Sequence, residues 1–410
     1  MTRLVFSGLL AAPLLLVASL TAGPAENGIR FFEERVRRDP DDFIAWNQLA
    51  DRYQRQLRHT GDDRFIGLMR QAAEQSLKAV PAEQNTGGLA ALAQAMLTAH
   101  RFAETRDAAR QLQELLPGKP RPLELLADAA LELGEYEEAR KLCEELKNLG
   151  GTGISAEPRL ARLEIIAGHN DNAREHFENG LTVAQNSTMA QPDIIAWFHL
   201  QLGELAFKTG AWEKAAEHYA DAEKASPDWS AIADHLAELH AARGQIPEAI
   251  ALYEKLVART PRPEFFQALG DLHTLANEPE KAAQSLARAE EAYLRSTSEG
   301  AVHFFHHLAG FYADSKPEPA KAIEWARKDL ELRKSIYAWD ALAWALYKNG
   351  QAAEAAEAAG KTLATGTRDP HLLYHAGLVR LAAGDILGGR TALQEATAIN
   401  PRFNTFHVHR

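Results

Sequence analysis

The chain has 410 residues, of which 46% are hydrophobic and 25% charged, and its formal net charge is −11. An acidic chain without a basic block binds nucleic acid poorly, because phosphate contacts need clustered Lys and Arg. The only cysteine is Cys143, which excludes an internal disulfide framework, so stability must come from packing. Cys143 lies between helical neighbours, and we expect it to be a buried small apolar residue rather than a nucleophile.

Residues 1–23 have the layout of a secretory signal peptide. Arg3 precedes an apolar run from Leu4 to Leu20, and small residues follow the run. The run is at the short limit for crossing a bilayer, so an uncleaved membrane anchor is the alternative. Pro13 inside the run and the small residues after it favour cleavage. We therefore expect an exported protein, periplasmic or secreted, with no membrane span after cleavage.

The rest of the chain carries turn residues at a recurring distance. The markers are His100, Gly134, Gly168, Gly210, Gly244, Asn277, Gly350 and Gly384, and their commonest spacing is 34 residues. Each marker ends one helical segment, where chains often turn through a left-handed conformation. Glycine adopts this conformation freely, and Asn and His adopt it more readily than most other residues. A fixed period of this length predicts stacked helical hairpins.

The unit that begins at Trp197 is the most complete. It has Leu202-Gly203 before its turn glycine, and after the turn it has the residues Ala215, Tyr219, Ala222 and Pro227. This pattern resembles the tetratricopeptide repeat family, over about residues 28–405 of the chain. The resemblance implies an all-α fold: a right-handed superhelical solenoid of about ten helical hairpins that occupies residues 24–410. Small side chains at Gly203 and Ala215 would let the two helices of a hairpin approach closely.

The period is broken in three places. About eight residues are inserted near 184–193, a second excess lies near 295–303, and the first unit is long around 55–65. Longer helices with polar linkers explain these breaks, and lips on a binding surface are the alternative.

No catalytic motif is recognisable. The chain lacks a nucleophile elbow, an H-E-x-x-H motif, a phosphate loop and a dinucleotide fingerprint, so we expect a non-enzyme without a cofactor. His303 and His307 are four residues apart and share a helix face, a spacing that can bind a metal. No Asp, Glu or Cys completes a site in that motif, so we predict no metal site there or at the C-terminal His407 and His409.

In this family, fixed positions of each first helix line the concave face, where partners often bind. Transferred to the early units of this chain, these positions hold Asn47, Asp51, Arg55, Glu124, Asp128 and Arg162. In the late units they hold Phe304, His307, Phe311, Tyr337, Asp340, Trp344, Tyr347, Lys348, His371 and Tyr374. The late set is rich in aromatic residues, which are common binding anchors, and Trp344, Tyr347 and Tyr337 are the first candidates. The alternative is that several of them are core residues between hairpins.

One subclass of the family binds acidic chaperone tails through a clamp of Lys, Asn and Arg. Here the first two clamp positions hold Asn47 and Asp51 early in the chain, and Glu124 and Asp128 later. Acidic side chains there would repel an acidic tail. The resemblance therefore implies a non-catalytic protein-interaction scaffold that acts after export and binds a protein or peptide segment in its concave groove. The alternative is a small-ligand or metal carrier or sensor that uses the aromatic, His-bearing C-terminal half.

Overall fold

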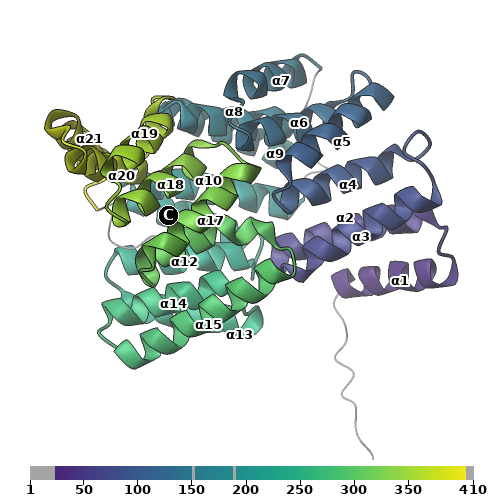
Figure 1. Ribbon diagram of the computed structural model, residues 1–410. Coiled ribbons are helices and arrows are strands. Elements are labelled where there is room, and N and C mark those ends of the chain that lie inside the picture. The colour runs from purple at the N-terminus through teal and green to yellow at the C-terminus, as the bar shows by residue number, and fades with distance from the viewer. Residues whose placement is uncertain (1–23, 150–152, 188–190, 403–410) are drawn as a thin grey trace, which may run out of the picture.

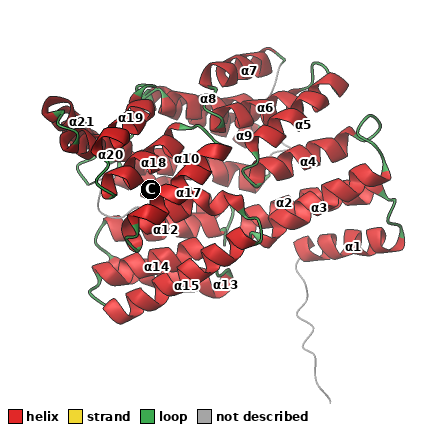
Figure 2. Cartoon of the chain, viewed as in Figure 1, coloured by secondary structure: helices red, strands yellow, loops and turns green. Residues whose placement is uncertain are grey.

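The computed structural model describes residues 24–149, 153–187 and 191–402. Within these ranges the chain forms 21 α-helices and no strand, so the predicted all-α solenoid is confirmed (Figures 1 and 2). The predicted signal peptide, residues 1–23, and the C-terminal histidines lie outside the described residues. Among the described helices, none combines the length and apolar character needed to cross a membrane.

Helix α1 (Pro24–Arg38) precedes ten hairpins, each made of an even-numbered and an odd-numbered helix. The even-numbered helices are α2 (Phe43–Thr60), α4 (Thr86–Thr98), α6 (Pro120–Glu132), α8 (Gly153–Ile166), α10 (Pro192–Lys208), α12 (Ser230–Ala242), α14 (Pro263–Leu275), α16 (Phe305–Gly310), α18 (Ile336–Lys348) and α20 (Pro370–Ala382). The odd-numbered helices are α3 (Arg64–Ala79), α5 (Phe102–Leu115), α7 (Tyr136–Asn148), α9 (Asn170–Asn186), α11 (Trp212–Ala225), α13 (Ile246–Arg259), α15 (Pro279–Ser298), α17 (Pro319–Leu332), α19 (Ala352–Leu363) and α21 (Ile386–Ile399). Most even-numbered helices also contact the next even-numbered helix, so they form the inner layer of the array.

The turn between the two helices of a hairpin follows the predicted chemistry. All eight predicted markers have positive φ, including the non-glycine residues His100 (57°) and Asn277 (58°). The eighth hairpin has no such turn. Its inner helix α16 is flanked by a 3-10 turn (Val302–Phe304) and a π-helical turn (Phe311–Ser315).

Close packing inside a hairpin explains the small residues in the repeat pattern. A Cβ atom placed on Gly203 would overlap the ring of Tyr219, and Ala215 and Tyr219 are themselves fully buried.

Cys143 is also fully buried, as expected, and burial raises the pKa of its thiol to about 11.

Two of the period breaks are longer helices. Helix α9 has 17 residues and α15 has 20, whereas most of the other odd-numbered helices have 12 to 14. The long first unit likewise has an 18-residue inner helix, α2. The longer-helix explanation is therefore confirmed for these elements, although residues 188–190 of the first break lie outside the described residues.

The array winds so tightly that its second superhelical turn rests on the first (Figure 1). Thr260, which leads into α14, donates to the carbonyl of Thr60 at the end of α2 (3.2 Å). The amide of Lys334, which leads into α18, donates to the carbonyl of Glu132 at the end of α6 (3.0 Å). The inner helices α2 and α6 thus end against the beginning of the inner helix six hairpins later. We call this line of contact the seam.

The seam continues at the remaining hairpins. The imidazole rings of His100 and His303 meet with centroids 6.0 Å apart, which joins the end of α4 to the approach to α16. Gly168 after α8 packs against Gly366 before α20. The Asn400 amide donates to the carbonyl of Lys208 at the end of α10 (3.2 Å).

The turn glycines of the first superhelical turn therefore meet two requirements. They adopt positive φ, and they leave room for the second turn. A Cβ atom on Gly134 would lie 2.5 Å from the carbonyl oxygen of Lys334, whereas a Cβ atom on Gly350 in the second turn would meet nothing within 4 Å.

We predict that Gly134→Ala destabilises the protein more than Gly350→Ala. Both substitutions force alanine into a left-handed conformation, which costs about 1–2 kcal/mol. Only Gly134→Ala also overpacks the seam, which adds about 1–3 kcal/mol to the destabilisation. The measurement is the thermal and urea unfolding of both variants, with small-angle scattering to detect opening of the array. Equal destabilisation of the two variants would contradict the seam as a packed contact.

Candidate functional site

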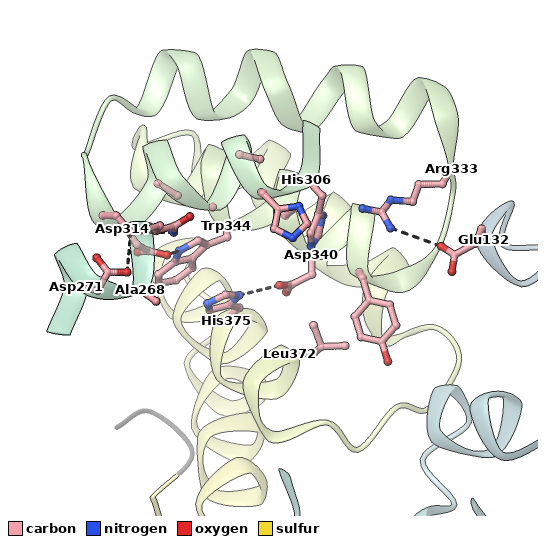
Figure 3. A pocket seen from close by; sticks show the side chains of 18 of the residues that line it. Glu132, Ala268, Asp271, His306, Asp314, Arg333, Asp340, Trp344, Leu372 and His375 are labelled. Atoms are coloured by element: carbon pink, nitrogen blue, oxygen red, sulfur yellow. Dashed lines mark hydrogen bonds and ion pairs between the residues drawn. The ribbon is translucent and has the colours of Figure 1, made fainter. Parts of the chain in front are cut away.

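A cavity of about 300 Å³ lies between the two superhelical turns (Figure 3). The first turn contributes Glu132 of α6 and Arg162 of α8 to its lining. The second turn contributes residues of α14, α16, α18 and α20 and of the π-helical turn. We call it the central cavity. It exists because the seam brings the inner helices of the two turns face to face.

Trp344 of α18 forms one wall of the central cavity. Its indole Nε1 donates to the carboxylate of Asp314 (2.9 Å), and the Lys348 ammonium donates to the same carboxylate (3.1 Å). The His375 ring stacks on the indole with centroids 3.9 Å apart, and its Nδ1 is hydrogen-bonded to Asp340 (2.8 Å). These contacts fix the orientation of the indole, and Figure 3 shows Asp314 and His375 beside Trp344.

The π-helical turn places Asp314 at this wall. Turns of this type are rare overall, but those that occur are often at functional sites. The extra residue in the turn changes the direction of the side chains near it. Ser315, the last residue of the turn, donates to Asp271 of α14 (2.9 Å) and accepts from Gln267 (3.0 Å). The turn thereby joins α14 to α18 along one side of the cavity.

A chain of charges crosses the opposite end of the cavity. Glu132 accepts from Arg162 (2.6 Å) and pairs with Arg333 across the seam (3.5 Å). Arg333 also pairs with Asp329 (3.0 Å), which is hydrogen-bonded to His306 (3.2 Å). Burial alone would raise the pKa of Glu132, but the positive charges of Arg162 and Arg333 lower it to about 2. Glu132 is therefore a carboxylate at neutral pH.

A second, open depression lies beside the central cavity, between α18 and α20. We call it the aromatic groove, and its lining includes Trp344, Tyr347, Lys348, Tyr374 and Leu378. Trp344 and Tyr347 stack with centroids 5.1 Å apart, and Trp344 and Tyr374 lie 6.5 Å apart. Trp344 is thus a shared wall between the central cavity and the aromatic groove.

A family model matches two segments of this array. The model is described as tetratricopeptide repeat, and it covers residues 90–152 and 236–295. These two segments are tetratricopeptide repeats. Repeats of this family generally form non-catalytic scaffolds for protein interaction.

Solved structures of similar architecture include other repeat proteins. A tetratricopeptide repeat protein from Parabacteroides merdae is 17% identical, with 64% of this chain and 93% of that one covered and a TM-score of 0.41. The human IFIT1 dimer with PPP-AAAA is 13% identical, with 92% and 87% covered and a TM-score of 0.47. No curated protein matches the sequence.

The ten predicted site residues of the repeat array fall into four places. His307, Tyr337, Asp340 and Trp344 line the central cavity. Trp344 again, with Tyr347, Lys348 and Tyr374, lines the aromatic groove.

The other three predicted residues lie elsewhere. His371 lies in a separate small pocket beside Lys208 and Asn400 of the seam. Phe304 and Phe311 belong to neither site, because they are 1% and 0% exposed and pack against Tyr293 in the core. The placement of these two phenylalanines on the concave surface is corrected accordingly: they fill the space between α15 and α16.

The concave-face positions predicted in the early units hold side chains that make contacts within the array. Asn47 donates to Asn85 (2.8 Å), and the carboxylates of Glu124 and Asp128 accept from Ser155 (2.7 Å) and Arg159 (2.6 Å). Only Arg162 of this set lines the central cavity. Contacts between neighbouring hairpins thus take up several of the polar side chains on the early inner helices.

Sequence reasoning missed Glu132, Asp314, Arg333 and His375. Glu132 continues the four-residue spacing of Glu124 and Asp128 along α6, a signal that could have identified it. His375 likewise follows His371 by four residues along α20. No pattern in the repeats indicates the other two, because Asp314 depends on a π-helical turn and Arg333 on the seam.

We predict that Glu132→Gln makes stability less dependent on pH in the acid range. Since the pKa of Glu132 falls from 4.5 to about 2 on folding, its stabilisation is complete above pH 4.5 and is lost as the pH falls towards 2. At pH 7 the variant leaves two guanidinium groups without their shared carboxylate, and we expect a loss of about 3–5 kcal/mol.

The measurement is the melting temperature of wild type and variant from pH 7 to pH 2.5. The difference between them should shrink as the pH falls. Glu114→Gln, which changes an exposed carboxylate on α5, serves as the control and should follow wild type. A difference that stays constant with pH would contradict the assignment.

Proposed function

We propose that this protein is a non-catalytic interaction scaffold that acts after export and binds a segment of a protein partner in the aromatic groove. One observation carries the proposal: Trp344, Tyr347 and Tyr374 lie together along an open groove of about 670 Å³ on the inner layer. Aromatic side chains dominate the binding energy of many interfaces, because they bury a large area at a small cost in side-chain entropy.

The surroundings of the groove favour a preformed site. Trp344 is held by Asp314 on one side and by the ring of His375 on the other, so little conformational freedom remains to be lost on binding. Lys348 at the rim lies 5.2 Å from the Trp344 ring centroid. A partner segment that places an apolar side chain between the two tyrosines and an acidic group near Lys348 would fit this arrangement.

The alternative is that the protein carries or senses a small ligand. The central cavity favours this alternative, because it lies between the turns and its volume of about 300 Å³ suits a compact molecule better than a peptide. A partner segment would contact Trp344 from the aromatic groove, and a small ligand would contact it from the central cavity. Substitutions in one site can therefore separate the two functions.

We predict that the double variant Tyr347→Ala, Tyr374→Ala loses partner binding while it remains folded. Both side chains are half-buried and line the groove but not the central cavity. Loss of two aromatic anchors should weaken binding at least tenfold, because anchor residues often contribute about 2 kcal/mol or more each. Phe31→Ala removes an exposed aromatic ring on α1 and is the control, with unchanged binding expected.

Cross-linking from a defined position identifies the surface involved. Cys143 is buried, so Leu378→Cys places one accessible thiol in the groove, and Ala220→Cys places one on the exposed side of α11. A photo-reactive label at each thiol is then tested with proteins from the envelope or secreted fraction. We expect one partner to be cross-linked from the groove only, and cross-linking to be lost in the double variant. Cross-linking of that partner from α11 alone would overturn the proposed groove.

A further inference from the structure

Another cavity of about 300 Å³ lies where the fifth and sixth hairpins come round to the C-terminal half of α2. It shares no lining residue with the central cavity or the aromatic groove. We call it the arginine pocket, and the lining residues that matter here are Arg52, Arg55, Arg58 and His59 of α2, Asp193 of α10 and Trp229 before α12.

Contacts between α2 and the sixth hairpin fix the walls of the arginine pocket. The indole of Trp229 donates to the carbonyl of Arg58, and the Ser230 hydroxyl donates to the carbonyl of His59 (3.3 Å). The last carbonyls of a helix have no partner within it, and they carry the negative end of its dipole. Donors from the sixth hairpin occupy two of these oxygens, so the end of α2 repels an anion less than a free helix end would.

Positive charge predominates in the arginine pocket. Three arginines and one aspartate line it, so its formal charge is +2 with histidine counted as neutral. The whole chain, in contrast, has a formal net charge of −11. A pocket whose sign is opposite to that of the surrounding protein raises the local concentration of anions.

Arg52 has hydrogen-bonding capacity that the protein does not use. Its guanidinium lies 5.0 Å from the ring centroid of Phe32, and its Nε is buried without a hydrogen-bond partner. Among the described residues, no carboxylate forms an ion pair with it. A guanidinium has five N–H donors, so Arg52 can donate to a ligand in the pocket without giving up an internal ion pair.

The other two arginines form only surface ion pairs. Arg55 pairs with Asp51 (2.6 Å), and Arg58 pairs with Asp193 (3.4 Å). Both arginines are exposed, and exposed ion pairs contribute little free energy. A ligand with a higher charge can therefore replace these carboxylates as the partner of the two guanidinium groups.

We propose that the arginine pocket binds the dianionic group of a small phosphate ester. Guanidinium groups bind phosphate oxygens through paired N–H donors, and Arg52, Arg55 and Arg58 direct three of them to one pocket. A phosphate monoester carries a charge of about −1.5 to −2 at pH 7, which matches the formal charge of the lining. The pocket volume of about 300 Å³ lies within the range of small-molecule sites, so the organic group of the ester has room beside Trp229.

The experiment is calorimetric titration of the full chain with phenyl phosphate at pH 7 and low ionic strength. We expect one site, with binding at least tenfold weaker in the double variant Arg52→Gln, Arg55→Gln, because two charge-assisted contacts are lost. The matched control is Arg110→Gln, Arg390→Gln, which removes the same charge from exposed positions on α5 and α21. The control should bind as wild type does.

Asp193→Asn tests the proposal with a change of opposite sign. It removes the one carboxylate from the lining and frees Arg58 from its ion pair. We therefore expect phenyl phosphate to bind at least threefold more tightly to this variant. A purely structural role of these side chains would not produce tighter binding.

Two further probes define the ligand. Benzoate has the same ring with a single charge, and inorganic phosphate has the charge without the ring. We expect both to bind several-fold more weakly than phenyl phosphate. Benzoate binding as tightly would overturn the assignment to a dianion, and inorganic phosphate binding as tightly would overturn the assignment to an ester.

Two results would overturn the pocket itself. One is no binding of phenyl phosphate to wild type at millimolar concentration. The other is equal affinity in wild type and in the folded Arg52→Gln, Arg55→Gln variant. Circular dichroism checks the fold of each variant, and Arg55→Gln alone, which changes an exposed side chain, replaces the double variant if that one unfolds.

Discussion

The contact between successive superhelical turns positions the candidate site in this molecule. In an open solenoid each repeat touches only its neighbours, and the concave surface faces solvent. Here the ends of α2, α4, α6 and α8 meet the approaches to α14, α16, α18 and α20. The concave surface is therefore divided into the central cavity and the aromatic groove, and Trp344 separates them.

The charges at the seam are buried deeply enough to define how the two turns fit. Glu132 belongs to the first turn, and Arg333 and Asp329 belong to the second. A buried ion pair adds little stability over well-packed apolar residues, but breaking one is costly. The network therefore penalises any displacement of one turn along the other. A rigid pocket formed by two distant parts of the chain requires this kind of positional constraint.

Sequence reasoning reached the parts of this structure that depend on local spacing. The left-handed turns at His100 and Asn277, the close approach at Gly203 and the burial of Cys143 all follow from residues within one hairpin or its neighbours. The seam was not predictable, because it depends on the small rotation between hairpins accumulated over six of them. For the same reason Arg333 was missed.

The aromatic side chains illustrate the limit of transferring positions between repeats. Trp344 and Tyr374 reach the inner surface as expected, whereas Phe304 and Phe311 turn into the core. The difference arises in the eighth hairpin, where a 3-10 turn and a π-helical turn replace regular helix on either side of α16. Phe304 lies in the 3-10 turn and Phe311 in the π-helical turn, and a repeat pattern carries no signal for either turn.

The six-hairpin offset has a consequence for how such a chain can change in length. Ordinary solenoids gain or lose repeats easily, because each unit satisfies only its two neighbours. In this protein a duplicated or deleted hairpin between α6 and α18 would shift Gly134 away from Lys334 and place Glu132 opposite the wrong side chains. Repeat number between these elements is thus constrained much as strand number is in a closed barrel.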